Sequence, residues 1–566
     1  MYIANLPFGS RTVVHARTND GKSLHCATVV TSPACEVCQT VAEPSAQSLM
    51  DTLASLVSEV NKRGFVMTMT AENTTAKNQG IEHFDVLIVG AGISGIGSAY
   101  HLQEQCPERT FVILENYETF GGTWHMHRYP GVRSDSDLYT FGYRFKPWVG
   151  APIASSAEIK KYMGEVIKEA DLDKHIRYRH RITGAAWSSL ENRWTVEVLK
   201  LETNETFHIT TNFLWMCQGY YKHSQGYTPE WPNMDSYKGR IVHPQTWPED
   251  LDYANKKVLV IGSGATAATL VPAMAQTAEH VTVLQRSPTY FVPGRNVNEL
   301  ADTLRQLEIK EEWVHEIVRR KTLFDQQQVT INSVAYPEMV KEVLLGGVKE
   351  LLPEGYDMKH FTPKYRPWQQ RIAFVPDGDL FAGIRAGKAS MVTDEIETFT
   401  ETGVRTKGGV DIEADIIVTA TGFNLSVLGD IPMSVDGTPV DWAKTVTYRG
   451  MMFTGVPNLA WVFGYFRASW TLRVDLMGDF VARLFKLMDK KGAKRVTPRL
   501  REVEDKDMKI GAWIDPENFN PNYLVRSQHL MPQSGDKPEW MHDQDYWKEK
   551  DILPAANLED GCLIFE

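Results

Sequence analysis

Short apolar runs rich in β-branched residues recur along the chain, and each is followed by a glycine turn and then by a helical pattern. The run from Asp85 to Gly90 predicts a strand buried on both faces, as in a parallel sheet. A helix is expected over about 93–105, and the apolar run 111–114 predicts the next strand. This order of strand, turn, helix and strand is typical of a βαβ unit.

The same order returns later in the chain. Residues 257–261 predict a strand, a helix is expected from Ala265, and residues 280–284 predict a second strand. Two further strands that end at a glycine are expected over 214–219 and 415–422. Two βαβ starts and two such endings predict an α/β protein with two Rossmann-like dinucleotide-binding domains, one inserted into the other.

The parts of the chain outside these units have different patterns. Residues 294–362 show few strand signals and several helical stretches, among them 311–321 and 337–352, so a helical insert is expected there. A long helix is expected over 470–488. Beyond Pro498 the chain is polar and Pro-rich, which predicts little regular structure.

The first 80 residues also differ from the rest. They hold short polar stretches and one amphipathic helix expected over about 45–62, and ordered structure is expected to begin at Phe84. We therefore interpret residues 1–80 as a non-catalytic extension, with 1–66 dispensable.

A glycine motif lies in the first turn. In the run from Gly90 to Gly95, the first glycine permits a tight turn, Gly92 lets the backbone approach a pyrophosphate, and Gly95 lets the helix pack on the strand. The helix N-terminus adds unpaired N–H donors for phosphate. Glu115, 23 residues after Gly92, ends the second strand where a carboxylate can bind ribose hydroxyls. This acid favours FAD or NAD over NADP.

A second turn, Gly121-Gly-Thr-Trp124, follows closely. Alone it is an ordinary turn. After the first motif it favours a flavin, because a Gly-Gly pair lets backbone pass close to the flavin phosphates or ribityl chain, and Trp124 can pack beside the ring.

The second βαβ unit carries the variant G-x-G-x-x-A in the run from Gly262 to Ala268. Its second strand ends in Gln285, Arg286 and Ser287, with no acid at that point. A carboxylate would repel a 2′-phosphate, whereas a guanidinium binds it as a planar, permanently charged fork. The second site is therefore expected to prefer NADPH, although a surface arginine after a strand is the alternative.

The composition limits the partners. The chain has 60 Lys and Arg against 71 Asp and Glu, a net charge of -11, which argues against nucleic acid as a partner. No apolar run reaches the roughly 18 residues of a membrane span, and no secretory signal is present. A cytoplasmic protein with at most peripheral membrane contact is expected. Cys35 and Cys38 form a C-x-x-C without a second pair, so no metal site is expected.

The run Tyr237-Lys-Gly-Arg-Ile-Val-His-Pro-Gln-Thr-Trp-Pro248 resembles the fingerprint F-x-G-x-x-x-H-x-x-x-W-P/D of Baeyer–Villiger monooxygenases, with Tyr237 in place of phenylalanine. The resemblance runs from about Phe84 to about Trp540 and is closest to the ethionamide-activating group. Other segments similar to that group are 128–137, 243–250, 261–267, 285–290, 370–381 and 468–472.

The resemblance implies a flavin enzyme in which NADPH reduces FAD and one atom of O₂ passes to a ketone, giving an ester, or to the sulfur of a thioether or thioamide. A permanent cation is needed where charge develops in a dry site. By resemblance, Arg371 supplies it, with Arg366 as the alternative. Asp135 is expected to orient Arg371 and fits better than Asp137.

By the same resemblance, His243 and Trp247 couple NADPH position to domain movement, although a histidine and a tryptophan packed in a linker explain them nearly as well. Cys217 is expected to be a small buried residue rather than a redox thiol. The catalytic residues expected are Arg371 and Asp135. The cofactor-binding residues expected are Gly90, Gly92, Ser94, Gly95, Glu115, Thr123, Trp124, His125, Met126, Arg133, Ser134, Asp135, Ile182, His243, Trp247, Gly262, Ser263, Gly264, Ala265, Thr266, Ala267, Ala268, Gln285, Arg286 and Ser287.

Other functions are compared with these assignments. An N- or S-oxidising flavin monooxygenase shares every cofactor feature. A pyridine nucleotide–disulfide reductase would need a cysteine pair beside the first motif, and none is there. A nucleotide-binding sensor without turnover is the non-enzymatic alternative, and no oligomeric state is predicted.

The expected divisions are a 1–80 extension, a FAD-binding domain over 81–222 and 423–540, an NADP-binding domain over 223–422 and a tail over 541–566.

Overall fold

The computed structural model describes residues 12–17, 23–29 and 80–566. By its internal contacts the chain divides into two units, residues 1–80 and 81–566. In the first unit, strands β1 (Thr12–Arg17) and β2 (Ser23–Val29) pair antiparallel. The helix expected over 45–62 and the pair Cys35 and Cys38 lie outside the described residues.

Residues 81–566 begin with the predicted βαβ motif. Strand β3 (Glu82–Val89) leads into helix α2 (Ile93–Gln105) and then into strand β4 (Phe111–Leu114), which pairs parallel with β3. The last four residues of β3 and all of β4 are buried, as the continuous apolar runs predict. Strand β8 (Glu205–Met216) lies parallel on the other side of β3.

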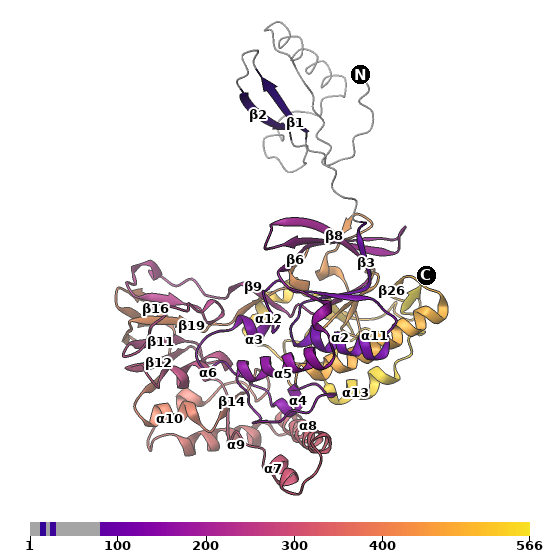
Figure 1. Cartoon of the computed structure of the whole chain (residues 1–566). Coiled ribbons are helices and arrows are strands. Elements are labelled where there is room, and N and C mark those ends of the chain that lie inside the picture. Colours follow the sequence, from indigo (N-terminus) through magenta and orange to yellow (C-terminus); the bar gives the residue numbers. More distant parts are fainter. Residues whose placement is uncertain (1–11, 18–22, 30–79) are drawn as a thin grey trace. The chain divides into compact units, whose positions relative to one another are not determined.

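Strands from distant parts of the chain complete this larger sheet (Figure 1). Its order is β22-β21-β6-β7-β8-β3-β4-β5, and β25 also pairs with β8. Because β21, β22 and β25 follow the second nucleotide unit in sequence, the first domain is built from two separated segments. The bounds of these strands are β5 Ile176–Arg177, β6 His180–Ser188, β7 Arg193–Lys200, β21 Met433–Val435, β22 Thr438–Pro439 and β25 Leu459–Trp461.

A second sheet of five parallel strands has the order β10-β19-β11-β12-β15. The predicted α/β fold with two Rossmann-like units is therefore confirmed. We call these the first and second nucleotide units, or the first and second unit for short, and the second lies within the sequence of the first. The elements of this unit are β10 Arg240–Val242, β11 Lys257–Ile261, α6 Ala265–Met274, β12 His280–Gln285, α10 Asp379–Arg385, β15 Ala389–Thr393, a hairpin of β16 Ile396–Thr400, β17 Gly403–Thr406 and β18 Asp411–Glu413, and β19 Ile416–Thr419.

The two sheets are joined by a ribbon of two strands. Strand β9 (Tyr221–Gly226) carries the chain away from the larger sheet, and strand β20 (Phe423–Leu425) brings it back. The two strands pair antiparallel, with Phe423 opposite Gly226. The two chain segments that connect the nucleotide units therefore lie side by side in this ribbon.

Helices fill the predicted insert. The expected helix over 311–321 is the beginning of one helix more than twice as long, α8 (Glu311–Ala335), since the polar stretch after Lys321 keeps good helix formers such as glutamine. The other elements there are β13 Phe291–Gly294, α7 Glu299–Gln306, α9 Pro337–Leu351 and β14 Ala373–Pro376. Shorter helices α3 Thr123–Met126 and α4 Leu138–Phe141 and the longer α5 Ser156–Glu169 lie earlier in the chain.

The segment beyond Pro498 is more regular than expected. A fully buried ion pair explains the difference: Arg473 donates to Glu549 at 3.0 Å, and Tyr465 also donates to Glu549. Polar residues such as Glu549 form hydrogen bonds in the interior rather than facing solvent. A polar sequence is therefore compatible with an ordered segment here. Strand β26 (Val496–Pro498) precedes it, and its own elements are β27 Ile510–Ala512, α12 Asn522–Ser527, β28 Gln533–Gly535, α13 Tyr546–Ala555 and β29 Leu563–Phe565.

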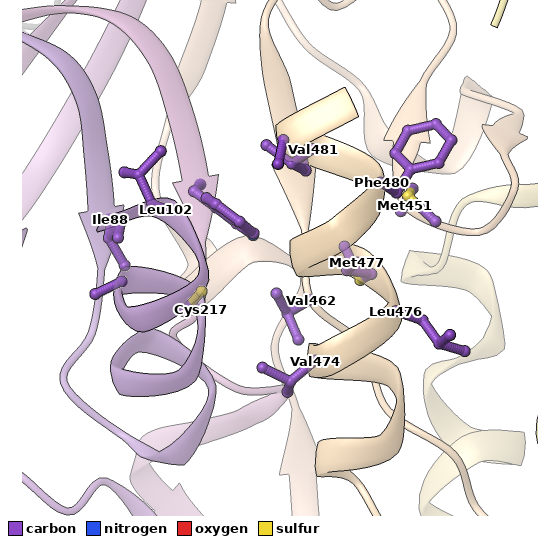
Figure 2. Close-up of a cluster of buried hydrophobic side chains, with 14 of the residues drawn as sticks. Ile88, Leu102, Cys217, Met451, Val462, Val474, Leu476, Met477, Phe480 and Val481 are labelled. Atoms are coloured by element: carbon purple, nitrogen blue, oxygen red, sulfur yellow. The ribbon is translucent and has the colours of Figure 1, made fainter. Parts of the chain in front are cut away.

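The long helix expected over 470–488 is α11 (Thr471–Lys491), and it packs against α2. Figure 2 shows apolar side chains of this core, with Val474 and Val462 between helix α11 and Cys217. Burial raises the pKa of the Cys217 thiol to about 12, and its S–H donates to Ser98. Cys217 is thus a small buried residue, as expected.

Candidate active site

The first glycine motif has the geometry that its sequence predicts. Gly90 has φ +95°, which only glycine adopts without strain, and it approaches the Cys217 carbonyl. A Cβ at Gly95 would lie 1.8 Å from the Gly90 carbonyl oxygen, so no larger residue fits between helix α2 and its strand. Gly92 caps α2 without a side chain, which leaves the helix N-terminus open to a phosphate.

Residues from both nucleotide units line one cavity of about 870 Å³. The first motif supplies one end of it, and the start of α6 in the second unit supplies another part. Because a single cavity is bounded by both units, two nucleotides bound to them can meet there. The predicted site residues that line it are Gly90, Gly92, Ser94, Glu115, Thr123, Trp124, Met126, Arg133, Asp135, Ile182, Ala265, Thr266 and Arg371.

Glu115 is buried at the edge of this cavity. Its two carboxylate oxygens accept N–H bonds from Ala91 at 2.7 Å and from Tyr117 at 2.8 Å. Burial raises the pKa of Glu115, and these backbone donors act against that shift. A carboxylate has about four acceptor positions, so one remains for a ribose hydroxyl after the backbone bonds from Ala91, Tyr117 and Asn116.

Arg371 and Asp135 meet in the cavity. Arg371 Nη2 lies 3.4 Å from Asp135 Oδ2, and the two residues come from the two different units. The Asp135 charge raises the pKa of Arg371 further, against the effect of burial, so the guanidinium stays charged. The cavity therefore holds a fixed cation with an oriented carboxylate beside it.

The two alternatives to this pair lie elsewhere. Arg366 donates to the backbone and side chain of Asn518 and does not line the cavity. Asp137 accepts from the N–H of Tyr139 and caps helix α4, with its pKa raised to about 6 by burial. Both residues have partners outside the cavity lining, which leaves Arg371 and Asp135 as the pair that faces the cavity.

Residues next to Asp135 are tied to the second unit. Arg133 pairs with Asp379 of α10 at 2.5 Å and also donates to the carbonyl of Ala268. Ser134 is buried and accepts from the Ala154 N–H. His125 is also buried, close to Glu118 and Lys160, and does not line the cavity. The loop that carries Asp135 is thus held by contacts with both units.

The second glycine motif is equally tight. Gly262 has φ +122°, and a Cβ there would lie 2.3 Å from the Ala420 carbonyl oxygen, whereas a Cβ at Gly264 would meet nothing within 4 Å. Ser263 bonds to the backbone oxygen of Ser287. Ala267 and Ala268 are buried in the core of this unit. The open backbone at Gly264 is the point where a pyrophosphate can approach helix α6.

The three residues that end strand β12 point in different directions. Arg286 and Ser287 are exposed beside this turn, as a site for a 2′-phosphate requires. The Gln285 side chain is buried instead, and its amide donates to the His360 carbonyl and the Thr393 hydroxyl. The Gln285 carbonyl accepts from the Asp394 N–H, so both its side chain and its carbonyl are engaged within the protein.

His243 lies against the ribbon that joins the two units. Its Nε2 donates to the Gly422 carbonyl at 3.1 Å, and its Nδ1 accepts from the Gln245 N–H at 3.1 Å. Burial lowers the pKa of His243, which favours this neutral form. The Gln245 amide donates in turn to the carbonyls of Lys222 and His223. Trp247 packs on the core of the second unit, so this segment contacts both ribbon strands and that core.

Several cavity residues were not predicted. The Trp470 indole donates to Ser94 at 2.7 Å, which connects the start of α11 to the first motif. Gln218, after strand β8, lines the cavity with both amide atoms buried and unpaired among the described residues. Its position just before the glycine that ends the strand expected over 214–219 was the available signal. An amide without protein partners at this place suits a polar group of a bound cofactor.

These features fit a flavin nucleotide and a phosphorylated nicotinamide nucleotide. Two helix N-termini with glycine turns can take pyrophosphates, Glu115 can take a ribose, and the Gln218 amide is available within the cavity. Among the described residues no group of three or more metal-ligating side chains occurs, and no helix of that part is long and apolar enough to cross a membrane.

Known proteins with similar sequences are flavin enzymes. Residues 152–541 match the family model described as flavin-binding monooxygenase-like, and residues 88–147 match an NAD(P)-binding Rossmann-like domain. The chain is 44% identical over 488 residues to the probable FAD-binding monooxygenase AlmA of Acinetobacter baylyi, covering 86% of this chain and 96% of that protein. It is 45% identical over 491 residues to the FAD-containing monooxygenase EthA of Mycolicibacterium smegmatis, covering 86% and 97%.

Solved structures with a similar fold are more distant in sequence. One is an oxidized steroid monooxygenase bound to NADP, with a TM-score of 0.67 and 22% identity, covering 85% of this chain and 99% of that chain. Another is cyclohexanone monooxygenase from Rhodococcus sp. Phi1 bound to NADP+, with a TM-score of 0.60 and 22% identity, covering 75% and 88%. At this identity the likeness concerns the fold.

Proposed function

We propose, from the premise that this chain belongs to the flavin-binding monooxygenase-like family, that it inserts one oxygen atom of O₂ into ketones to give esters. The enzyme is a flavin monooxygenase that uses FAD and NADPH. Oxidation of thioethers or thioamides is included in the proposal, because the same oxygen transfer can end on sulfur. The observation that carries it is the Arg371–Asp135 pair in a cavity bounded by both nucleotide units.

The overall reaction balances without a further reagent: a ketone, O₂, NADPH and one proton give an ester, NADP+ and water. When bound and reduced by NADPH, FAD would supply the electrons that activate O₂, one atom of which passes to the substrate. The protein must hold both nucleotides, provide positive charge where negative charge develops, and limit access of water.

The named residues are assigned to these tasks. Gly92 and the start of α2 bind the FAD pyrophosphate, with Glu115 on its ribose. Gly264 and Arg286 take the pyrophosphate and the 2′-phosphate of NADPH. Arg371 supplies the fixed cation, and Asp135 orients it through their contact.

His243 and Trp247 are assigned to the coupling of nucleotide position and domain movement. His243 bonds to the Gly422 carbonyl on one side and accepts from Gln245 on the other, and Gln245 in turn holds the first ribbon strand. A shift of the second unit therefore changes both strands of the ribbon together. This arrangement unites the two interpretations of the motif, since a packed linker is also what transmits a movement.

The proposal is tested by purifying the protein and measuring FAD content, NADPH oxidation and product formation with a panel of ketones and thioethers. Ester formation from ketones with one NADPH consumed per ester supports it. Sulfoxide formation without any ester would identify an N- or S-oxidising flavin monooxygenase instead. A colourless protein that takes up no flavin would overturn the proposal altogether.

A further inference from the structure

Three tyrosines gather beside Arg371, and no cofactor role assigned above uses them. Tyr220 and Tyr221 follow the turn after strand β8 and line the cavity, and Tyr523 lies in helix α12 of the C-terminal segment. We call these three residues the tyrosine cluster. The Tyr220 ring stacks on Trp470, with centroids 5.1 Å apart and planes 12° apart. Stacking on Trp470 fixes the position of the Tyr220 hydroxyl.

The hydroxyls of the cluster form a directed arrangement. The Tyr220 and Tyr221 hydroxyls lie 2.8 Å apart and share one hydrogen bond, so one of their two protons is available to another acceptor. The Tyr523 hydroxyl is buried and has no hydrogen-bond partner among the described residues. The rings of Tyr221 and Tyr523 lie 6.0 Å apart, edge to face. A buried hydroxyl without a partner costs about 1–3 kcal/mol, and it is available to donate to a bound group.

The surroundings keep these hydroxyls protonated, so they can donate hydrogen bonds. Burial raises the pKa of Tyr221 well above its usual range, and the nearby Arg371 charge only partly opposes this. The same two effects act in the same directions on the pKa of Tyr523. Tyr220, Tyr221 and Arg371 therefore present neutral O–H donors and a fixed cation to one part of the cavity.

The wall around these donors is aromatic. Phe423 lies 4.6 Å from the Tyr221 ring, centroid to centroid, and also lines the cavity. Donors and a cation set in an apolar wall bind an oxygen that is an acceptor, and they bind it more strongly as negative charge develops on it. A ketone carbonyl is such an acceptor, whereas a thioether sulfur accepts hydrogen bonds only weakly.

We propose that Tyr221, supported by Tyr220 and Tyr523, forms with Arg371 a subsite for the carbonyl oxygen of the substrate. This inference rests on the proposed function and adds a determinant of specificity to it. The subsite favours substrates with a carbonyl acceptor and contributes little to oxidation of a thioether. Tyr221 contacts the substrate, and Tyr220 and Tyr523 position it.

The test uses three probes of similar length: 2-octanone, methyl hexyl sulfide and the unreactive amide N,N-dimethylhexanamide. The holoenzyme with NADP+ is titrated with the amide by calorimetry, and turnover of the other two is measured separately. Tyr221→Phe should weaken amide binding about tenfold and lower kcat/KM for 2-octanone by about tenfold or more. Its kcat/KM for the sulfide should stay within about threefold, with FAD content and the rate of flavin reduction unchanged.

Tyr523→Phe provides an independent variant that does not threaten folding. Removing this buried hydroxyl should leave Tm equal or higher. Amide affinity should fall by about threefold or more, because the Tyr220 hydroxyl loses the neighbouring donor that acts on its pKa. Tyr448→Phe is the matched control, because that hydroxyl faces Asp560 and does not line the cavity. It should leave amide affinity unchanged.

Two results would overturn the inference. One is unchanged amide affinity in both Tyr221→Phe and Tyr523→Phe, and the other is an equal loss of ketone and sulfide turnover, which would assign the cluster to general packing. If the wild-type enzyme forms sulfoxide but no ester, the proposed ketone function fails. The amide titration then decides the subsite alone, so the two failures remain distinct.

Discussion

The Arg371 guanidinium lies 3.4 Å from the Asp135 carboxylate, although the two residues belong to different nucleotide units. Asp135 and Ser134 lie in the same loop as Arg133, and Arg133 forms an ion pair with Asp379 of the second unit. The contact between the units is therefore made at the place where the cavity holds its fixed charge. A change in how the two units meet would move that charge relative to both nucleotides.

Replacing the guanidinium should separate flavin reduction from oxygen transfer. Arg371→Ala should retain FAD and still be reduced by NADPH, but ester formation should fall by about two orders of magnitude or more, since a preorganised charge is lost. Stopped-flow reduction and product analysis measure the two steps. Arg366→Ala, which removes a surface contact with Asn518, is the control and should keep ester yield. Full ester yield in Arg371→Ala would refute the assignment.

Arg286 should determine the choice of nicotinamide cofactor. Its exposed guanidinium stands at the end of strand β12, beside the second glycine turn, and none of the three residues that end this strand is an acid. Arg286→Ala should raise KM for NADPH by about tenfold or more while KM for NADH changes little, because NADH lacks that phosphate. Initial rates with both nucleotides measure the difference. Arg405→Ala, whose side chain pairs with Asp411, is the matched control. Equal effects on both nucleotides would place the phosphate elsewhere.

The parts of the site that the sequence predicts well are those set by local backbone sterics. Gly95 had to be glycine because a Cβ would meet the Gly90 carbonyl, a contact between residues five positions apart. Glu115 follows from the length of one βαβ unit, and its carboxylate binds Ala91 as that geometry requires. These steric limits act between residues that are close in sequence, so a sequence pattern reveals them.

What the sequence does not reveal depends on contacts between distant segments. The Gln285 side chain turns toward His360 and Thr393, which no pattern near Gln285 indicates. Glu549 in a polar tail pairs with buried Arg473, so polarity there predicts loops where the structure has a helix. Tyr523 joins Tyr220 only because the C-terminal segment returns to the cavity. Each of these depends on tertiary packing, which overrides local preference.

His243 and Gly226 should behave as one unit. A Cβ at Gly226 would lie 2.0 Å from a ring carbon of His243, so Gly226→Ala must displace the ring from its bonds to Gly422 and Gln245. That variant should lose several degrees of Tm and oxidise NADPH with more H₂O₂ and less product. Adding His243→Ala removes the clash, so the double variant should be more stable than Gly226→Ala alone. Strictly additive losses of Tm would contradict this packing.

Acid should destabilise the protein through buried His315, which is only 3% exposed. Its Nδ1 accepts from the Trp148 N–H, and burial, aided by the Arg319 charge, lowers its pKa from 6.5 to about 4. Between these values the unfolded chain binds a proton that the folded chain does not. The free energy of unfolding therefore falls as pH decreases from 6.5 towards 4, and His315 has no such effect above 6.5.

At pH 5 this contribution amounts to about 2 kcal/mol. His315→Asn keeps an acceptor for Trp148 but cannot titrate, so the difference in unfolding free energy between pH 7.5 and pH 5 should shrink by about that amount. Denaturant unfolding at the two pH values measures it. His208→Asn, at an exposed position, should leave the difference as it is in the wild type. If His315→Asn also leaves it unchanged, then His315 is not held neutral by burial, and the packing of helix α8 on the Trp148 loop is looser than the structure has it.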